Sequence, residues 1–143
     1  MLEEFEGYSE GRMRIKCRAI VRGVDEGEML ITRQAINFLT MIDLKTGTVK
    51  DDKHELYEKN IANKILVFPN AIGSSVGAYS IYALKINNLA PNAIVCSKAD
   101  ITTASGCAIA NIPLVDSPES NLFTIKSGST VKVDAINGLI ETA

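Results

Sequence analysis

The sequence predicts one α/β domain in which short strands outnumber helices. Residues 64–68 are an apolar run typical of a buried strand, and a Gly-Ser-Ser turn at 73–75 separates them from a segment with helical apolar spacing. Brief apolar runs bounded by turn residues recur along the chain and predict further strands. The 143 residues, 46% of them hydrophobic, suffice for one well-buried core but not for two typical domains. We therefore expect residues 1–143 to form a single compact domain.

The first third of the chain has strand character. Residues 14–21 alternate partly between polar and apolar side chains, as a half-buried strand does. Asp25-Glu26-Gly27 supplies a turn, and residues 28–32 have the pattern of a returning strand, so we expect a β-hairpin here. Residues 36–42 form another apolar stretch of strand character, which the Asp, Thr and Gly residues of 43–48 end in a turn.

The helix expected after the Gly-Ser-Ser turn is marked by apolar residues at helical spacing, namely Val76, Tyr79, Ala83 and Ile86. Ser74 or Ser75 would cap it. The unpaired N–H groups at such a helix start carry partial positive charge, so they can hold an anionic substrate group or stabilise an alkoxide. The segment is apolar around most of its circumference, and its second face therefore needs a cover, either a further sheet or another polypeptide.

The remaining elements are expected to be short. We expect strands at residues 91–96, 122–125, 131–134 and 139–142, a short helix at 102–110, and a charged loop or short helix at 51–60. This arrangement predicts β-rich layers flanked by few helices.

The charge and hydropathy of the sequence limit the classes of partner expected for this chain. The formal net charge is −2, and no Lys/Arg-rich stretch is interleaved with aromatic residues, so we expect neither nucleic acid nor an anionic membrane as a partner. No run approaches the roughly 20 apolar residues of a membrane span. The N-terminal Met-Leu-Glu-Glu-Phe-Glu lacks the basic-then-apolar order of a secretory signal, and we expect a cytoplasmic protein.

The potential metal ligands are few and scattered. Cys17, Cys96 and Cys107 form no Cys-x-x-Cys pair, and the pattern favours buried thiols over a disulfide framework or metal site. The single histidine, His54, lies in a charged stretch, which favours a solvated loop histidine over a phosphocarrier or metal ligand. We expect this chain to bind no metal alone, and any metal to come from a partner.

Three chemical interpretations of the Gly-Ser-Ser turn compete. A phosphate-binding P-loop would need a lysine that is absent here. Gly73-Ser74-Ser75-Val76-Gly77 matches a nucleophile elbow with Ser75 in the middle, but the only histidine lies upstream in a loop, and the chain is too short for a hydrolase sheet. A plain helix cap without chemistry is the third interpretation.

The chain resembles the aconitase X swivel-domain family. Four motifs in matching order and spacing carry the resemblance, at residues 43–47, 54–57, 73–79 and 89–95. Within that family, residues 104–116 and the Val-Gly-Ala-Tyr segment after the serines are most similar to the small subunits of archaeal phosphomevalonate dehydratases. The resemblance runs from about residue 15 to residue 140, nearly the whole chain. It implies a swivelling β/β/α domain.

The resemblance also implies a shared active site. The domain would close over an aconitase-like large subunit, forming a heterodimer, and a 4Fe-4S iron–sulfur cluster in that subunit would act as Lewis acid on the leaving hydroxyl. Ser74 would be the base that takes the proton next to the substrate carboxylate, while Gly73 and Ser75 would help to bind the substrate. The implied reaction dehydrates (R)-5-phosphomevalonate to trans-anhydromevalonate 5-phosphate in a modified mevalonate pathway.

Two other functions stay open at this point. Another branch of the family dehydrates cis-3-hydroxy-L-proline, and a non-catalytic swivel or interaction domain would use the helix start only to hold a partner or an anion. Contacts to a substrate phosphate are equally open, with Lys64, Lys85, Arg33 and the backbone near Gly73 as candidates.

Overall fold

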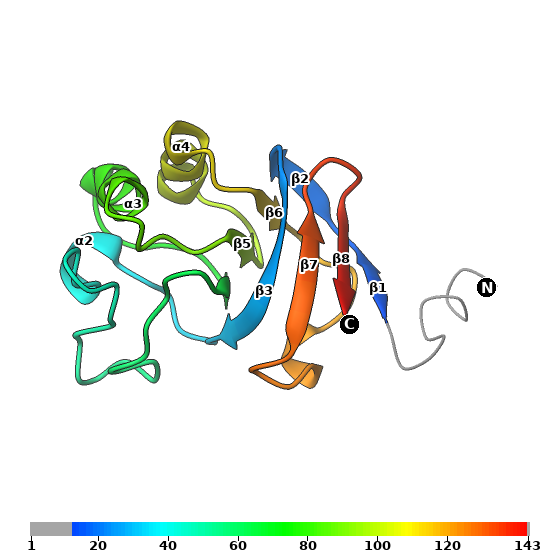
Figure 1. Cartoon of the computed structure of the whole chain (residues 1–143), viewed down its shortest axis with the longest axis horizontal. Helices are drawn as coiled ribbons and strands as arrows, with labels where there is room; N and C mark the ends of the chain where they lie inside the picture. Colours follow the sequence, from blue (N-terminus) through cyan, green and yellow to red (C-terminus); the bar gives the residue numbers. More distant parts are fainter. Residues whose placement is uncertain (1–12, 143) are drawn as a thin grey trace.

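The computed structural model describes residues 13–142, whose strands join into one mixed sheet that carries helices on one side (Figure 1). The strands are β1 (Arg14–Lys16), β2 (Arg18–Val21), β3 (Val24–Ile31), β4 (Ile65–Phe68), β5 (Ala93–Cys96), β6 (Leu114–Asp116), β7 (Thr130–Asp134) and β8 (Leu139–Thr142). The helices are α2 (Phe38–Met41), α3 (Val76–Ile86) and α4 (Ile101–Ala110), and the 3₁₀ turn η2 spans Leu122–Thr124.

The sheet has a parallel half and an antiparallel half that meet at β3. Its strand order is β1-β8-β7-β3-β4-β5-β6-β2. Strands β3, β4, β5 and β6 run parallel, and the antiparallel β2 closes that edge beside β6. On the other side of β3, strands β7, β8 and β1 pair antiparallel. Figure 1 shows α2, α3 and α4 beside the parallel half, with β7, β8 and β1 on the far side of β3.

Alternating side chains of the parallel strands fill two separate cores. On β4, Leu66 and Phe68 belong to a helix-side core, whereas Ile65 and Val67 belong to a second core between the parallel and antiparallel halves of the sheet. Strands β4, β5 and β6 are therefore buried on both faces, as parallel strands usually are. These layers confirm the predicted α/β class with its β/β/α arrangement.

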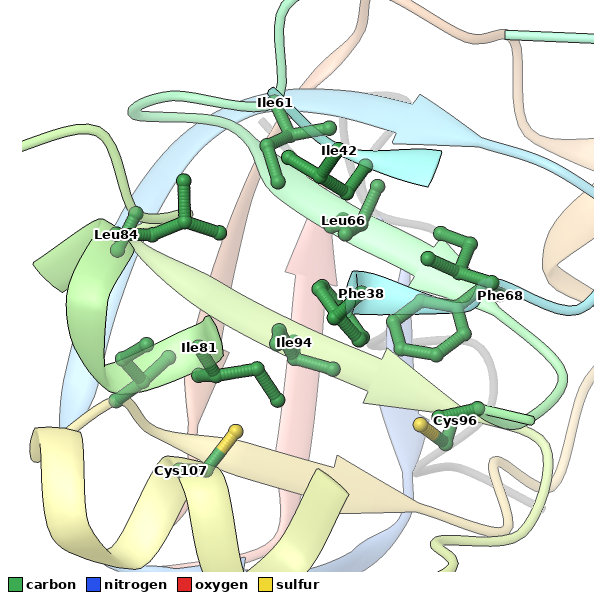
Figure 2. Packing of buried hydrophobic residues seen from close by; sticks show 14 of the residues in the cluster. Phe38, Ile42, Ile61, Leu66, Phe68, Ile81, Leu84, Ile94, Cys96 and Cys107 are labelled. Atoms are coloured by element: carbon green, nitrogen blue, oxygen red, sulfur yellow. The ribbon is translucent and has the colours of Figure 1, made fainter. Parts of the chain in front are cut away.

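The helix-side core joins α2, α3 and α4 to the parallel strands (Figure 2). Ile81 and Leu84 of α3 share this core with Ile94 of β5. Phe38 of α2 meets Phe68 edge-on, with ring centres 5.6 Å apart. Such aromatic pairs add about 0.5–1.5 kcal/mol beyond the burial of their area. This core fixes the start of α3 relative to the end of β4.

The strands, helices and turns with clear sequence patterns are confirmed. Strand β4 and helices α3 and α4 lie where the sequence predicts them. The strands expected at residues 131–134 and 139–142 are also present, as β7 and β8, which pair antiparallel. The turn predicted at residues 43–48 is present, and Gly47 adopts a φ of +81° there. Residues 51–60 contain turns but no helix of their own, in agreement with the predicted charged loop.

The predicted hairpin between residues 14–21 and 28–32 is wrong. The first segment breaks at Cys17 into β1 and β2, which pair with β8 and β6. The predicted turn at Asp25-Glu26-Gly27 lies inside β3, where these residues pair with β7. Their side chains are largely exposed, and an antiparallel strand with one solvated face tolerates such polar residues.

Two further strand predictions are wrong because apolar side chains in short helical turns imitate a strand. Residues 36–42 hold two isolated bridges, of Ile36 to Ala71 and of Ile42 to Val49, with α2 between them. The first N–H groups of α2 are capped by Asn37. Residues 122–125 contain η2, capped by Asn121. In both segments the apolar side chains reflect burial in a core and not the two-residue period of a strand.

The prediction that His54 is a solvated loop histidine is wrong, because its side chain is buried. Its Nε2 lies 3.2 Å from the carbonyl oxygen of Ala35, and its Nδ1 accepts a hydrogen bond from the N–H of Leu56 at 3.1 Å. These partners fit a neutral imidazole with the proton on Nε2, which donates to Ala35. His54 therefore braces the loop of residues 51–60 against the segment before α2.

No sheet covers the outer face of α3, so that alternative is excluded for residues 13–142. Gly77, Ala78, Ile81 and Leu84 are buried, whereas Val76, Tyr79, Tyr82 and Ile86 are exposed.

Among the described helices, none is long and apolar enough to cross a membrane.

Candidate active site

The carboxyl ends of the four parallel strands bring the candidate residues to one edge of the sheet. Open α/β sheets bind ligands at this edge, in the loops that follow the strands. Here β4 continues into residues 69–75 and β5 into residues 97–100, while β3 continues into Thr32 and Arg33. The Gly-Ser-Ser turn lies at the end of the first of these loops, directly before α3.

Gly73 allows a sharp turn against Asn37. Its φ is +101°, a conformation that residues with a side chain rarely adopt. A Cβ placed on Gly73 would lie 2.6 Å from Nδ2 of Asn37. The sequence therefore needs glycine at this position for two independent reasons, backbone conformation and space.

Ser74 and Ser75 are both exposed at the start of α3. Ser75 occupies the N-cap position, as expected, but its side chain makes no capping hydrogen bond. The Ser74 hydroxyl instead accepts a long hydrogen bond from the N–H of Val76, at 3.3 Å. Within residues 13–142, the backbone N–H groups of Ser74 and Ser75 have no hydrogen-bond partner. Two hydroxyls and two free donors thus meet at the positive end of a helix dipole.

Asp100 ties the serine loop to the next helix. One of its oxygens, Oδ1, accepts from the N–H of Ala71 at 2.7 Å and from the Thr103 hydroxyl at 2.9 Å. The other, Oδ2, caps α4 through the N–H of Thr103. A single carboxylate therefore fixes the path of residues 69–75 relative to α4.

Removing the Asp100 carboxylate should destabilise the protein. We expect Asp100→Ala to lower the free energy of unfolding by about 1–3 kcal/mol, because a helix cap is lost and the N–H of Ala71 loses its partner. Urea denaturation measures this change. The control Asp25→Ala removes an exposed carboxylate that bonds only its neighbour's N–H, and it should stay within about 0.5 kcal/mol of wild type. Equal losses in the two variants would contradict the role of Asp100.

A second carboxylate at this edge, Asp116, is buried and paired. Arg18 donates to both of its oxygens, at 2.8 and 2.7 Å, and the N–H of Ala99 donates at 2.8 Å. The hydrogen bond from the Arg18 guanidinium is the main cause that lowers the pKa of Asp116 below its ordinary value. This pair fastens β2 to the end of β6 and to the loop after β5.

We expect the ion pair of Arg18 and Asp116 to stabilise the fold less at acid pH. Because the pKa of Asp116 is lower in the folded chain than in the unfolded chain, its stabilisation is present above about pH 4 and is lost as pH falls through the folded value. Asp116→Asn should therefore be less stable than wild type at pH 7 and should show a flatter fall in stability below about pH 4. Urea titrations at several pH values measure both, and parallel curves would contradict the assignment.

The described residues supply no metal site. In residues 13–142, no group of three or more His, Cys, Asp or Glu side chains is placed to hold a metal ion. Cys96 and Cys107 are buried, as the sequence predicts, and burial raises the pKa of both thiols, that of Cys107 to about 12. Cys17 is half-buried, and burial raises its pKa to about 12 as well. A cluster needs several thiolates gathered at one place, and the described residues hold no such group, so an iron–sulfur cluster does not fit these cysteines.

A family model described as the aconitase X swivel domain matches residues 14–142. The chain belongs to this family. Similar proteins that match nearly their full length are named phosphomevalonate dehydratase small subunit. The one from Methanococcoides burtonii is 47% identical, over 90% of this chain and 95% of the relative. The one from Thermococcus kodakarensis is 44% identical, over 90% of this chain and 96% of the relative.

A solved structure agrees with this assignment. The holo-form crystal structure of Thermococcus kodakaraensis aconitase X matches with a TM-score of 0.86 and 43% identity, covering 91% of this chain and 98% of that chain. The predicted family and fold are therefore confirmed, and the described chain is an aconitase X swivel domain in its β/β/α layers.

Two hollows open at the strand edge of the swivel domain and share Phe123. The larger, of about 470 Å³, lies beside Arg33, Lys126 and Glu55. The Arg33 guanidinium stacks 4.7 Å from the centre of the Phe123 ring. The smaller, of about 190 Å³, follows the ends of β4 and β5. Neither hollow is lined by Gly73, Ser74 or Ser75 at the start of α3.

Only one of the three cationic side chains considered for phosphate lies at this edge. Arg33 follows the end of β3, whereas Lys64 precedes β4 and is 3.9 Å from a Glu28 oxygen. Lys85 lies in the last turn of α3, with its Nζ 3.5 Å from the carbonyl oxygen of Asn111. The two lysines therefore lie at the end of the domain opposite to the serines.

Sequence reasoning missed Asn37 and Asp100 at the site. Both are side chains of the N-cap type placed directly before a short apolar segment, and this signal could have revealed them. Asn37 was hidden because its segment was interpreted as a strand, and Asp100 because the expected helix began at residue 102.

Proposed function

We propose that this chain is the small subunit of a hydro-lyase that converts (R)-5-phosphomevalonate to trans-anhydromevalonate 5-phosphate. The observation that carries this proposal is the identity of 44–47% to named phosphomevalonate dehydratase small subunits, over 90% of this chain and 95–96% of theirs. The match to the family model, over residues 14–142, includes the Gly-Ser-Ser turn and every described strand and helix.

We assign the role of base to Ser74. The reaction removes the proton from the carbon next to the substrate carboxylate. The hydroxyl leaves from the neighbouring carbon with the electrons of its C–O bond and is released as water after it takes up a proton. The electrons of the broken C–H bond form the C=C bond, and the proton moves to Ser74 Oγ. An alkoxide at Ser74 is favoured by the positive end of α3 and by the free N–H groups beside it.

Gly73 and Ser75 would serve to bind the substrate. Gly73 lets the chain turn so closely that an anionic oxygen can reach the backbone donors of Ser74 and Ser75. The Ser75 hydroxyl, which is not used to cap α3, is available as a further donor to the substrate.

The partner in this proposal is a large, aconitase-like subunit that carries a 4Fe-4S cluster. Two observations support it. The relatives are named small subunits, and the described residues of this chain offer no ligand set for a cluster. We propose a heterodimer in which departure of the hydroxyl depends on the partner and removal of the proton depends on Ser74.

Turnover under anaerobic conditions tests this proposal. The chain is co-purified with its candidate large subunit, and (R)-5-phosphomevalonate and cis-3-hydroxy-L-proline are supplied in parallel. We expect the phosphomevalonate to lose water and the hydroxyproline to remain. Turnover of hydroxyproline alone would reassign the substrate, and no turnover of either by a cluster-loaded complex would favour a non-catalytic binding domain.

A further inference from the structure

Asn37 holds an unused amide donor against the serine turn. Its Oδ1 accepts from the N–H groups of Leu39 and Thr40, at 3.1 and 3.2 Å, and thereby caps α2. This use of the oxygen fixes which end of the amide is which, so the NH₂ group is the end that faces Gly73. Nδ2 is the atom nearest to the position that a Gly73 Cβ would occupy, at 2.6 Å.

The backbone around Asn37 holds this amide in place. The N–H of Ile36 donates to the carbonyl oxygen of Asn70, and the N–H of Ile72 donates to the carbonyl oxygen of Ile36. The two chain segments are thus joined one residue before Asn37 and one residue before Gly73. The backbone of Asn37 and the serine turn cannot move apart without breaking these hydrogen bonds, and the bonds that Leu39 and Thr40 donate to Oδ1 hold the amide itself.

The amide nitrogen is free and reaches solvent. Among residues 13–142, Nδ2 of Asn37 donates no hydrogen bond. In the same residues, no buried side-chain nitrogen or oxygen lacks a partner, so an unbonded Nδ2 must be accessible. It lies against Gly73, the residue directly before Ser74 and Ser75, whose backbone N–H groups are free. Three unpaired neutral donors therefore belong to one short turn and the side chain packed against it.

We infer that the Asn37 amide donates a hydrogen bond to the substrate carboxylate beside Ser74. This inference rests on the proposed function, in which Ser74 takes the proton from the carbon that bears the carboxylate. That carboxylate must then lie within a bond or two of the reacting carbon, next to Gly73. Negative charge grows on its oxygens as the proton leaves, and a fixed donor stabilises that charge. Asn37 is therefore a catalytic residue that contacts the substrate.

Two substitutions separate donation from capping. Both Asn37→Ser and Asn37→Asp keep a side-chain oxygen that can cap α2, but neither keeps the NH₂ group at pH 7. The control Thr40→Gly weakens α2 itself, through an exposed position, and leaves the amide intact. All three are measured in the complex, with thermal unfolding recorded for each. The substrate carries hydrogen or deuterium next to the carboxylate, which gives the isotope effect on kcat.

We expect kcat to fall by about 10²-fold in Asn37→Ser and further in Asn37→Asp, whose negative charge repels the carboxylate. The isotope effect should rise in both variants, because proton removal becomes the slow step. A merely structural role would lower the active fraction and leave the isotope effect unchanged. Thr40→Gly should keep the isotope effect of wild type.

The experiment distinguishes failure of this inference from failure of the proposed function. If the wild-type complex is active and both Asn37 variants keep its kcat and isotope effect, the inference is wrong and the proposed function stands. If the wild-type complex turns over cis-3-hydroxy-L-proline instead, the same variants are measured with that substrate, because it too has a carboxylate next to the carbon that loses its proton. A wild-type complex inactive on both substrates overturns both proposals.

Discussion

Ser74→Ala should lower kcat of the complex by about 10²–10⁴-fold, the range that a positioned base contributes. The fold should not change, since the Ser74 side chain is exposed and its hydroxyl makes only one long hydrogen bond, to the N–H of Val76. Anaerobic steady-state kinetics with (R)-5-phosphomevalonate measure the loss. Co-purification of the two subunits verifies that assembly persists.

Two other serines, one beside Ser74 and one on α4, serve as comparisons for it. Ser75→Ala should mainly raise KM, because we assign this side chain to substrate binding. Ser105→Ala, on an exposed position of α4, should behave as wild type. Should Ser75→Ala abolish turnover while Ser74→Ala does not, the base would be Ser75 and our assignment would be wrong.

Gly73→Ala should cause the largest structural loss at the site. The new Cβ would lie 2.6 Å from Asn37 Nδ2, and its backbone would keep a φ of +101° only under strain. Such strain costs about 1–3 kcal/mol. We also expect kcat to fall by about 10²-fold, because a shift of about 1 Å in a reacting group costs that much. Urea denaturation and kinetics of the complex measure the two effects.

Gly128→Ala is a matched control for this prediction. Gly128 has a nearly equal φ of +96°, but the nearest atom to its added Cβ, an oxygen of Glu28, would be 3.5 Å away. Both variants carry the backbone cost, and only Gly73→Ala carries the clash with Asn37. If the two variants lose the same stability, the contact between Gly73 and Asn37 does not constrain the turn.

Local patterns predicted the elements but not their pairing. The apolar run of β4 and the helical spacing of α3 were predictable, because each combines a strong period with a glycine turn between them. The pairing of β1 with β8 joins residues about as far apart as the chain allows, and no local signal encodes it. The predicted hairpin failed for this reason, since adjacent strand patterns were assumed to pair with each other.

The site was predictable in part for a similar reason. Gly73, Ser74 and Ser75 are consecutive, and their turn before a helix is visible in the sequence. Their supporting side chains come from other segments, Asn37 from before α2 and Asp100 from before α4. These contacts exist only after the parallel strands have aligned their carboxyl ends. The family resemblance supplied the role of Ser74, which periodicity and spacing alone do not reveal.

The central claim is that this chain completes an active site held mainly by another subunit. Titration of a fixed amount of cluster-loaded large subunit with this chain tests it most directly. We expect the large subunit alone to be inactive, turnover of (R)-5-phosphomevalonate to rise and saturate at one chain per large subunit, and the Ser74→Ala chain to block that rise by competing for the same place. An active large subunit without this chain, or full activity restored by the Ser74→Ala chain, would contradict the claim.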